Sequence, residues 1–126
     1  MIGCVKMINF KITAQDFSKN KFSPHKQHFL HDYTLISSKY ESCYLVLNLI
    51  KDFGPSNKAY AVLKFNGVVS IEQDFTQPWD SGGKYINDNN VIYINIDTFD
   101  YKISLNNGNT IIVKANVIEY EEIPAN

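Results

Sequence analysis

Hydrophobic and polar side chains alternate along much of this chain with the two-residue period of a β-strand. The regularity is greatest over residues 99–106, where every odd-numbered position is apolar and every even-numbered one is polar. The run Asn106-Asn107-Gly108-Asn109 is typical of a hairpin turn. It leads into a further strand, which the pattern predicts over residues 110–120. This part of the chain is therefore predicted to be plain antiparallel sheet.

The same alternation predicts strands earlier in the chain, and Thr13 is placed to cap a short helix. In the segment 43–50 both faces are largely apolar, which predicts a central strand covered on both sides. Cys43 is expected there as a small buried side chain. A tight hairpin is expected at Glu41-Ser42. The remaining strands are predicted over residues 5–12, 33–40, 59–65, 68–71 and 91–96.

The segment 72–90 has the weakest periodicity in the chain. It contains Pro78, the only tryptophan (Trp79), and the polar run Asn87-Asp88-Asn89-Asn90. A structureless loop of this length is uncommon in a compact domain, and such loops are often functional. We therefore expect an irregular segment with a role in binding, or one that folds back and buries Trp79 against the sheet.

These elements predict a mainly β protein of seven to eight mostly antiparallel strands. The architecture is expected to be one curved sheet, a sandwich or an open barrel. At most one or two short helices are expected near the N-terminus. The length of 126 residues and the hydrophobic content of 44% are ordinary for one globular domain, which is predicted to span residues 1–126.

Charge is unevenly distributed along the sequence. Residues 1–71 carry nine lysines against four acidic residues, a net +5, whereas residues 72–126 carry three lysines against nine acidic residues, a net −6. Such a split would steer association with a basic partner if it persisted in space. Interleaved strands could equally mix the two halves. All 12 basic residues are lysines, so the bidentate arginine contacts typical of nucleic-acid recognition are missing, and no nucleic acid is expected as a partner.

The candidates for catalytic or metal chemistry are weak. His28, His31 and Asp32 would share one face of a helix, but in an extended segment the two histidines point to opposite faces. The His31-Asp32 pair is interpreted instead as a hydrogen-bonded pin at a strand entrance. The run Ser81-Gly82-Gly83-Lys84 lacks the spacing of a phosphate-binding loop. No nucleophile motif is present. We expect no metal, no cofactor and no enzymatic activity.

Cys4 and Cys43 are too few for a disulfide framework. No charged and apolar leader precedes Cys4, and no apolar run approaches the roughly 20 residues needed to cross a bilayer. These features predict a cytoplasmic protein with no membrane partner.

The acidic and aromatic side chains of the second half are the candidate partner-binding residues. An aromatic anchor such as Trp79 within a polar rim is typical of a binding hot spot. The full set is Glu72, Asp74, Trp79, Asp80, Tyr85, Asp88, Glu119, Glu121 and Glu122.

Part of the chain resembles a known group of proteins. The resemblance rests on Phe29-Leu30-His31-Asp32 leading to Leu35, then Leu45-x-Leu47-x-Leu49, then Leu63-x-Phe65-x-Gly67-Val68. This succession is similar to that of small bacterial immunity-type proteins, in which an aromatic-x-His-Asp lead-in precedes antiparallel strands. It covers residues 29–71, and the first 28 residues and the Trp79 segment have no counterpart.

The resemblance implies a bacterial immunity protein encoded beside a polymorphic toxin, as in contact-dependent growth inhibition systems. Such a protein neutralises one cognate toxin by binding it and has no catalytic residues to transfer. The expected partner is the toxin's C-terminal domain, a basic nuclease whose active or substrate site would be occluded. The alternative is a small-ligand-binding or accessory β-domain whose cleft is roofed by residues 72–90. A third possibility is an enzyme or metal protein built on His28, His31 and Asp32.

Overall fold

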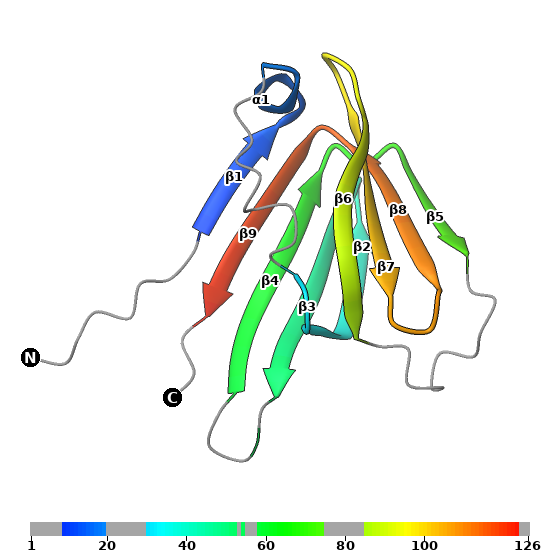
Figure 1. Cartoon of the computed structure of the whole chain (residues 1–126). Helices are drawn as coiled ribbons and strands as arrows, with labels where there is room; N and C mark the ends of the chain where they lie inside the picture. The colour runs from blue at the N-terminus through cyan, green and yellow to red at the C-terminus, as the bar shows by residue number, and fades with distance from the viewer. Residues whose placement is uncertain (1–8, 20–29, 53, 55–57, 75–84, 124–126) are drawn as a thin grey trace, which may run out of the picture.

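The computed structural model describes residues 9–19, 30–52, 54, 58–74 and 85–123, without the side chains of Ser18 and Tyr93 (Figure 1). These residues form nine strands and one short helix, so the mainly β class is confirmed with one strand more than predicted. In chain order the elements are β1 (Asn9–Thr13), α1 (Ala14–Ser18), β2 (Thr34–Glu41), β3 (Tyr44–Asp52), β4 (Lys58–Asn66), β5 (Ser70–Asp74), β6 (Ile86–Ile94), β7 (Phe99–Leu105), β8 (Thr110–Ala115) and β9 (Val117–Ile123).

The strands form two antiparallel sheets that face one another (Figure 1). The five-stranded sheet has the order β1-β9-β4-β3-β2, and the four-stranded sheet has the order β5-β8-β7-β6. Side chains of alternate residues enter the space between the sheets, as the periodicity predicted. The buried side chains of β3 and β4 in one sheet and of β7 and β8 in the other are Leu45, Leu47, Leu49, Ala61, Leu63, Phe65, Phe99, Tyr101, Ile103, Leu105, Ile111, Val113 and Ala115.

Two connections carry the chain from one sheet to the other at neighbouring points. Between β4 and β5, Gly67 has a φ of +62°, and the amide of Val69 donates to the carbonyl of Lys114 over 2.7 Å. Between β8 and β9 a single residue, Asn116, donates its amide to the carbonyl of Asn66 over 3.1 Å. The strand predicted over 110–120 is therefore two strands, because Asn116 interrupts an alternating pattern and redirects the chain.

A third link, here called the seam, joins residues 30–34 to residues 85–89. It ties the start of β2, at the edge of one sheet, to the start of β6, at the edge of the other. The amide of Asp32 donates to the carbonyl of Ile86 over 3.1 Å, and the amide of Ile86 donates to the carbonyl of Tyr33 over 2.8 Å. Thr34 and Tyr85 form an isolated β-bridge.

His31 and Asp32 belong to this seam. The Nδ1 of His31 donates to the carbonyl of Asn87 over 2.9 Å, and its Nε2 lies 3.4 Å from Oδ1 of Asp32. Asp32 has a φ of +71°, which turns the chain sharply into β2. The structure thus agrees with the interpretation of this pair as a pin at a strand entrance.

Asn89 is the buried polar residue of the seam. Its Oδ1 accepts from the amide of Leu30 over 3.2 Å, and its Nδ2 donates to the hydroxyl of Tyr101. This corrects the expectation of an irregular segment over 72–90, because Ser70–Asp74 is β5 and β6 already begins at Ile86. The polar run Asn87–Asn90 is compatible with a strand here, since tertiary partners satisfy the one amide that points inward.

The expectation of a buried Cys43 was wrong. Glu41 pairs with Tyr44, so the hairpin loop is Ser42-Cys43, one residue later than predicted. Both loop residues have positive φ, +50° and +64°, as a type I′ turn requires. This conformation places Cys43 at the exposed tip of the hairpin.

The predicted cover on both faces of β3 was also not found among the described residues. β3 lies inside its sheet between β4 and β2, as expected. Its inward residues are buried, but Tyr44, Val46, Asn48 and Ile50 on the outer face are partly exposed. Thr13 does cap α1 as predicted: its side chain accepts from the amide of Asp16 over 3.1 Å, and the Asp16 carboxylate accepts from the amide of Thr13 in return.

We expect Asn89→Ala to lower the free energy of unfolding by about 2 kcal/mol, because it strands the Leu30 amide and the Tyr101 hydroxyl without partners. Urea unfolding followed by circular dichroism measures the change. The exposed neighbour Asn90 supplies the control, since Asn90→Ala should alter stability by less than about 0.5 kcal/mol. Equal losses for the two variants would contradict the role assigned to Asn89.

The double variant Ser42→Asn/Cys43→Gly should raise the free energy of unfolding by about 1 kcal/mol, because Asn-Gly is the favoured pair for a type I′ turn. Thermal unfolding tests this. A Ser42→Ala/Cys43→Ala control keeps a Cβ at both positions and should give no gain. A lower Tm for the Asn-Gly variant would be inconsistent with the turn described.

Candidate functional site

Seven of the nine predicted binding residues lie in the described part of the chain, and they are spread over both sheets rather than gathered on one face. Trp79 and Asp80 lie outside the described residues. Glu119, Glu121 and Glu122 are on β9 of the five-stranded sheet. Glu72 and Asp74 are on β5 and Asp88 is on β6, both strands of the four-stranded sheet, and Tyr85 directly precedes β6.

Glu119 and Glu121 lie on the outer face of the five-stranded sheet among lysines. The register places Glu119 between Lys11 of β1 and Lys64 of β4. The Nζ of Lys64 lies 3.5 Å from Oε2 of Glu121. Because β9 pairs with strands from the lysine-rich half of the sequence, the charge split is largely cancelled on this face.

Glu72 and Asp74 lie together on the outer face of β5. Both are exposed, and neither forms an ion pair within the described residues. Being two apart on one strand, their Cα atoms are about 7 Å apart along it. They line an open groove of about 600 Å³ whose other lining residues are Gln73 of β5, Lys102 of β7, and Thr110 and Ile112 of β8. Here the acidic character of the second half does persist in space.

Tyr85 and Asp88 belong to the seam. The carbonyl of Tyr85 accepts from the amide of Asn106 over 2.8 Å, and its side chain is 53% exposed. The Oδ1 of Asp88 accepts from the amide of Asn89 over 2.9 Å. Hydrogen bonds therefore hold the backbone of this segment in place, while the ring of Tyr85 is exposed to solvent.

Glu122 has a different setting, because its side chain lies beside two buried tyrosine hydroxyls. Its Oε2 lies 3.2 Å from the hydroxyl of Tyr120 and 3.4 Å from that of Tyr33, and the two hydroxyls are 3.0 Å apart. The Nζ of Lys51 lies 4.7 Å from the centroid of the Tyr33 ring, within cation–π range. This group connects the seam to β9 and makes Glu122 part of the internal packing.

Burial raises the pKa of Tyr33, Tyr101 and Tyr120 above the ordinary tyrosine value, and burial is the largest cause in each case. For Tyr120 the hydrogen bond with Tyr33 and the negative charge of Glu122 raise the pKa further. These hydroxyls are therefore neutral hydrogen-bonding groups at physiological pH.

No group of three or more His, Cys, Asp or Glu side chains that could hold a metal ion occurs within the described ranges. His31 is exposed and already engaged with Asn87 and Asp32, and His28 lies outside those ranges. Of the helices in the same part of the chain, none has the length and apolar character of a membrane span.

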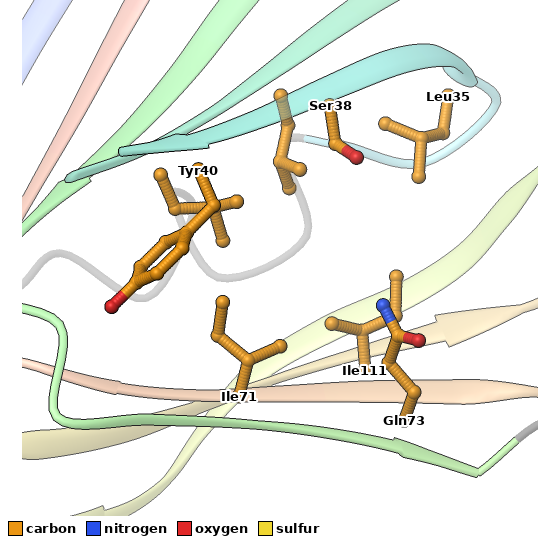
Figure 2. A pocket seen from close by; sticks show the side chains of 8 residues that line it. Leu35, Ser38, Tyr40, Ile71, Gln73 and Ile111 are labelled. Atoms are coloured by element: carbon orange, nitrogen blue, oxygen red, sulfur yellow. The ribbon is translucent and has the colours of Figure 1, made fainter. Parts of the chain in front are cut away.

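The structure contains a cleft between the two sheets, at a position that the alternative of a cleft roofed by residues 72–90 did not specify. We call it the inter-sheet cleft; its volume is about 260 Å³, and it opens between β2 and β5 (Figure 2). Alternation along the strands predicts which side chains point inward, but not where the sheets separate. The lining residues are Leu35, Ser38, Tyr40, Leu45, Leu47, Ile71, Gln73 and Ile111.

The raised pKa values of Tyr33 and Tyr120 predict that the folded protein loses stability at alkaline pH. In the unfolded chain these hydroxyls ionise near pH 10, whereas in the folded protein they stay protonated to higher pH. Their contribution to stability is thus complete below about pH 10 and is lost as pH rises further, by up to about 1.4 kcal/mol per pH unit for each tyrosine. Urea unfolding between pH 8 and about pH 11 measures this slope.

The variant Tyr120→Phe should reduce that alkaline slope while costing about 1 kcal/mol at pH 7 for the lost hydrogen bond. At pH 7, Tyr60→Phe is the matched control, since Tyr60 lies on the outer face and its hydroxyl has no partner among the described residues. An unchanged slope in Tyr120→Phe would show that the buried hydroxyls do not control the transition.

No protein-family model, curated protein or solved structure matches the chain. Its function is therefore inferred from the residues and the geometry described above.

Proposed function

We propose that this protein is a cytoplasmic bacterial immunity protein that binds a cognate toxin domain and neutralises it by occluding its active or substrate site. The proposed partner is a basic C-terminal nuclease domain. The proposal assigns the protein no catalytic step, so its residues act by steering and holding the partner.

The observation that carries this proposal is the pair Glu72 and Asp74 on the outer face of β5. Their carboxylates are exposed and lack ion-pair partners within the described chain, so their field extends into solvent. By contrast, Glu119 and Glu121 are surrounded by lysines, and Asp100 has Lys114 at 3.5 Å. A basic partner would therefore be drawn toward the β5 side of the four-stranded sheet.

The groove beside this pair has features of a recognition surface. It combines the two carboxylates with Lys102, Thr110 and the apolar side chain of Ile112. Complementary charge raises the association rate, while desolvated apolar and aromatic contacts slow dissociation. The resemblance of residues 29–71 to immunity-type proteins supports the same conclusion independently of the charges.

The proposal is tested with the polypeptide encoded by the neighbouring upstream gene. The two chains should co-purify, and expression of this protein should rescue cells from the toxicity of that polypeptide. A neighbouring product that is neither toxic nor bound would overturn the proposal.

Reversal of the acidic pair should slow association with that toxin. We expect Glu72→Lys/Asp74→Lys to lower the association rate constant about tenfold at low salt, with a smaller difference at high salt, because steering is screened by ions. Surface plasmon resonance across a salt series measures both rates.

Glu41→Lys is the control, since Glu41 lies on β2 of the other sheet, where Lys39 is 3.7 Å away. It should leave the association rate within about twofold of the wild type. Equal effects of the two changes would locate the binding surface elsewhere.

A further inference from the structure

The inter-sheet cleft lies on the opposite face of β5 from Glu72 and Asp74. Inward-facing residues of the five-stranded sheet form one wall, and Ile71 and Gln73 of β5 with Ile111 of β8 form the other (Figure 2). Gln73 lines both the cleft and the outer groove, but the other seven lining residues of the cleft are absent from the groove, so the ligand of the cleft does not depend on the proposed function.

β2 pairs with β3 from Thr34 to Glu41, but the seam links it to the four-stranded sheet at its first end, and the cleft opens toward the other. The seam fixes Thr34 against Tyr85, and a β-bulge between Leu35 and Ser37 follows at once. Beyond the bulge, Ser38 and Tyr40 point toward the four-stranded sheet, yet both remain exposed. Inward-facing residues that stay exposed mark a place where the two layers are not in contact.

The described residues of the walls are mostly apolar, and the polar groups among them are neutral. The apolar part includes Leu35, Leu47, Ile71 and Ile111. Figure 2 shows Ser38 and Gln73 reaching toward each other from opposite walls, with Tyr40 at the other end of the cleft.

The side chains of Ser38, Tyr40 and Gln73 have no hydrogen-bond partner within the described residues. They can therefore donate to or accept from a bound molecule.

These features select the chemistry of a ligand. None of the described residues that line the cleft is charged, so an ionised ligand would lose its hydration without a compensating partner among them. A molecule with an apolar body would be favoured, provided that a hydroxyl, carbonyl or amide meets the Ser38–Gln73 end. The volume of about 260 Å³ exceeds the ~150 Å³ of an apolar cavity that accommodates benzene.

We propose that the inter-sheet cleft is a binding site for a small, uncharged amphipathic molecule. Its alkyl or aromatic body lies between Leu47 and Ile71, and its polar group bonds to Ser38 and Gln73. The carboxylates of Glu72 and Asp74 in the outer groove take no part in this binding.

The test compares octan-1-ol with octanoate, which share a chain length but differ in charge at pH 7. At a concentration ten times its Kd, octan-1-ol should raise the Tm of the full chain by about 5 °C. Octanoate at the same concentration should raise it by less than about 1 °C, because its carboxylate has no partner in the cleft. Equal shifts for the two compounds would overturn the proposed selectivity.

Two variants on β2 locate the site. Ser38→Trp places an indole in the cleft and should abolish the shift caused by octan-1-ol, whereas Ser37→Trp places the same group on the outer face and should preserve it. Gln73→Leu should weaken octan-1-ol binding about tenfold through loss of one hydrogen bond. An unchanged shift in Ser38→Trp would overturn the assignment to this cleft.

Isoleucine methyl NMR on the wild-type chain gives a readout that does not depend on the variants. Octan-1-ol should move the signals of Ile71 and Ile111, which line the cleft, and leave those of Ile12 and Ile118 in place. Shifts confined to the exposed Ile92 and Ile96 would show surface binding and contradict the proposal. If only the toxin polypeptide moved Ile71 and Ile111, the cleft would be a protein contact and the small-molecule proposal would fail.

Discussion

The hydrogen bonds of the seam are the constraint on which the rest of this structure depends. Two chain connections run between the sheets, from β4 to β5 and from β8 to β9. Because β4 pairs with β9 and β5 pairs with β8, these connections join the layers at neighbouring points. The seam joins the edge strands β2 and β6, which are far apart in the sequence and are not linked by a short chain connection. Core packing alone would fix the spacing of the layers less strictly, because hydrophobic contact is not directional.

The position of the seam also explains where the layers separate. It fixes β2 only at Thr34, and the bulge that follows alters the direction of a strand that has β3 on one side alone. The second half of β2 therefore diverges from the four-stranded sheet. The inter-sheet cleft opens between this half of β2 and β5. The contact between the sheets at the first end of β2 and their separation at its second end are both consequences of the seam.

The sequence predicted what depends on neighbours in the chain and missed what depends on distant partners. Alternation over 99–106 and the turn at Asn106–Asn109 are local patterns, so the mainly β class and this hairpin could be derived. The seam could not, because the partners of His31 and Leu30 are 56 and 59 residues away. Asn87–Asn90 has the composition of a loop, but it pairs with β7, and buried partners satisfy the inward amide of Asn89.

The two faces of β5 show why the candidate surfaces were only half predictable. A count of acidic residues by sequence half predicts a charged face, but it cannot reveal that lysines of β1 and β4 offset the acids of β9. Charges on β5 and on β2, where Lys39 and Glu41 lie, also discourage these edges from pairing with a strand of another molecule. Charged edges resist the addition of a strand, so an extended polypeptide is disfavoured at β2 and β5. The inner apolar side chains between these two strands remain accessible, so the cleft is better suited to a small molecule.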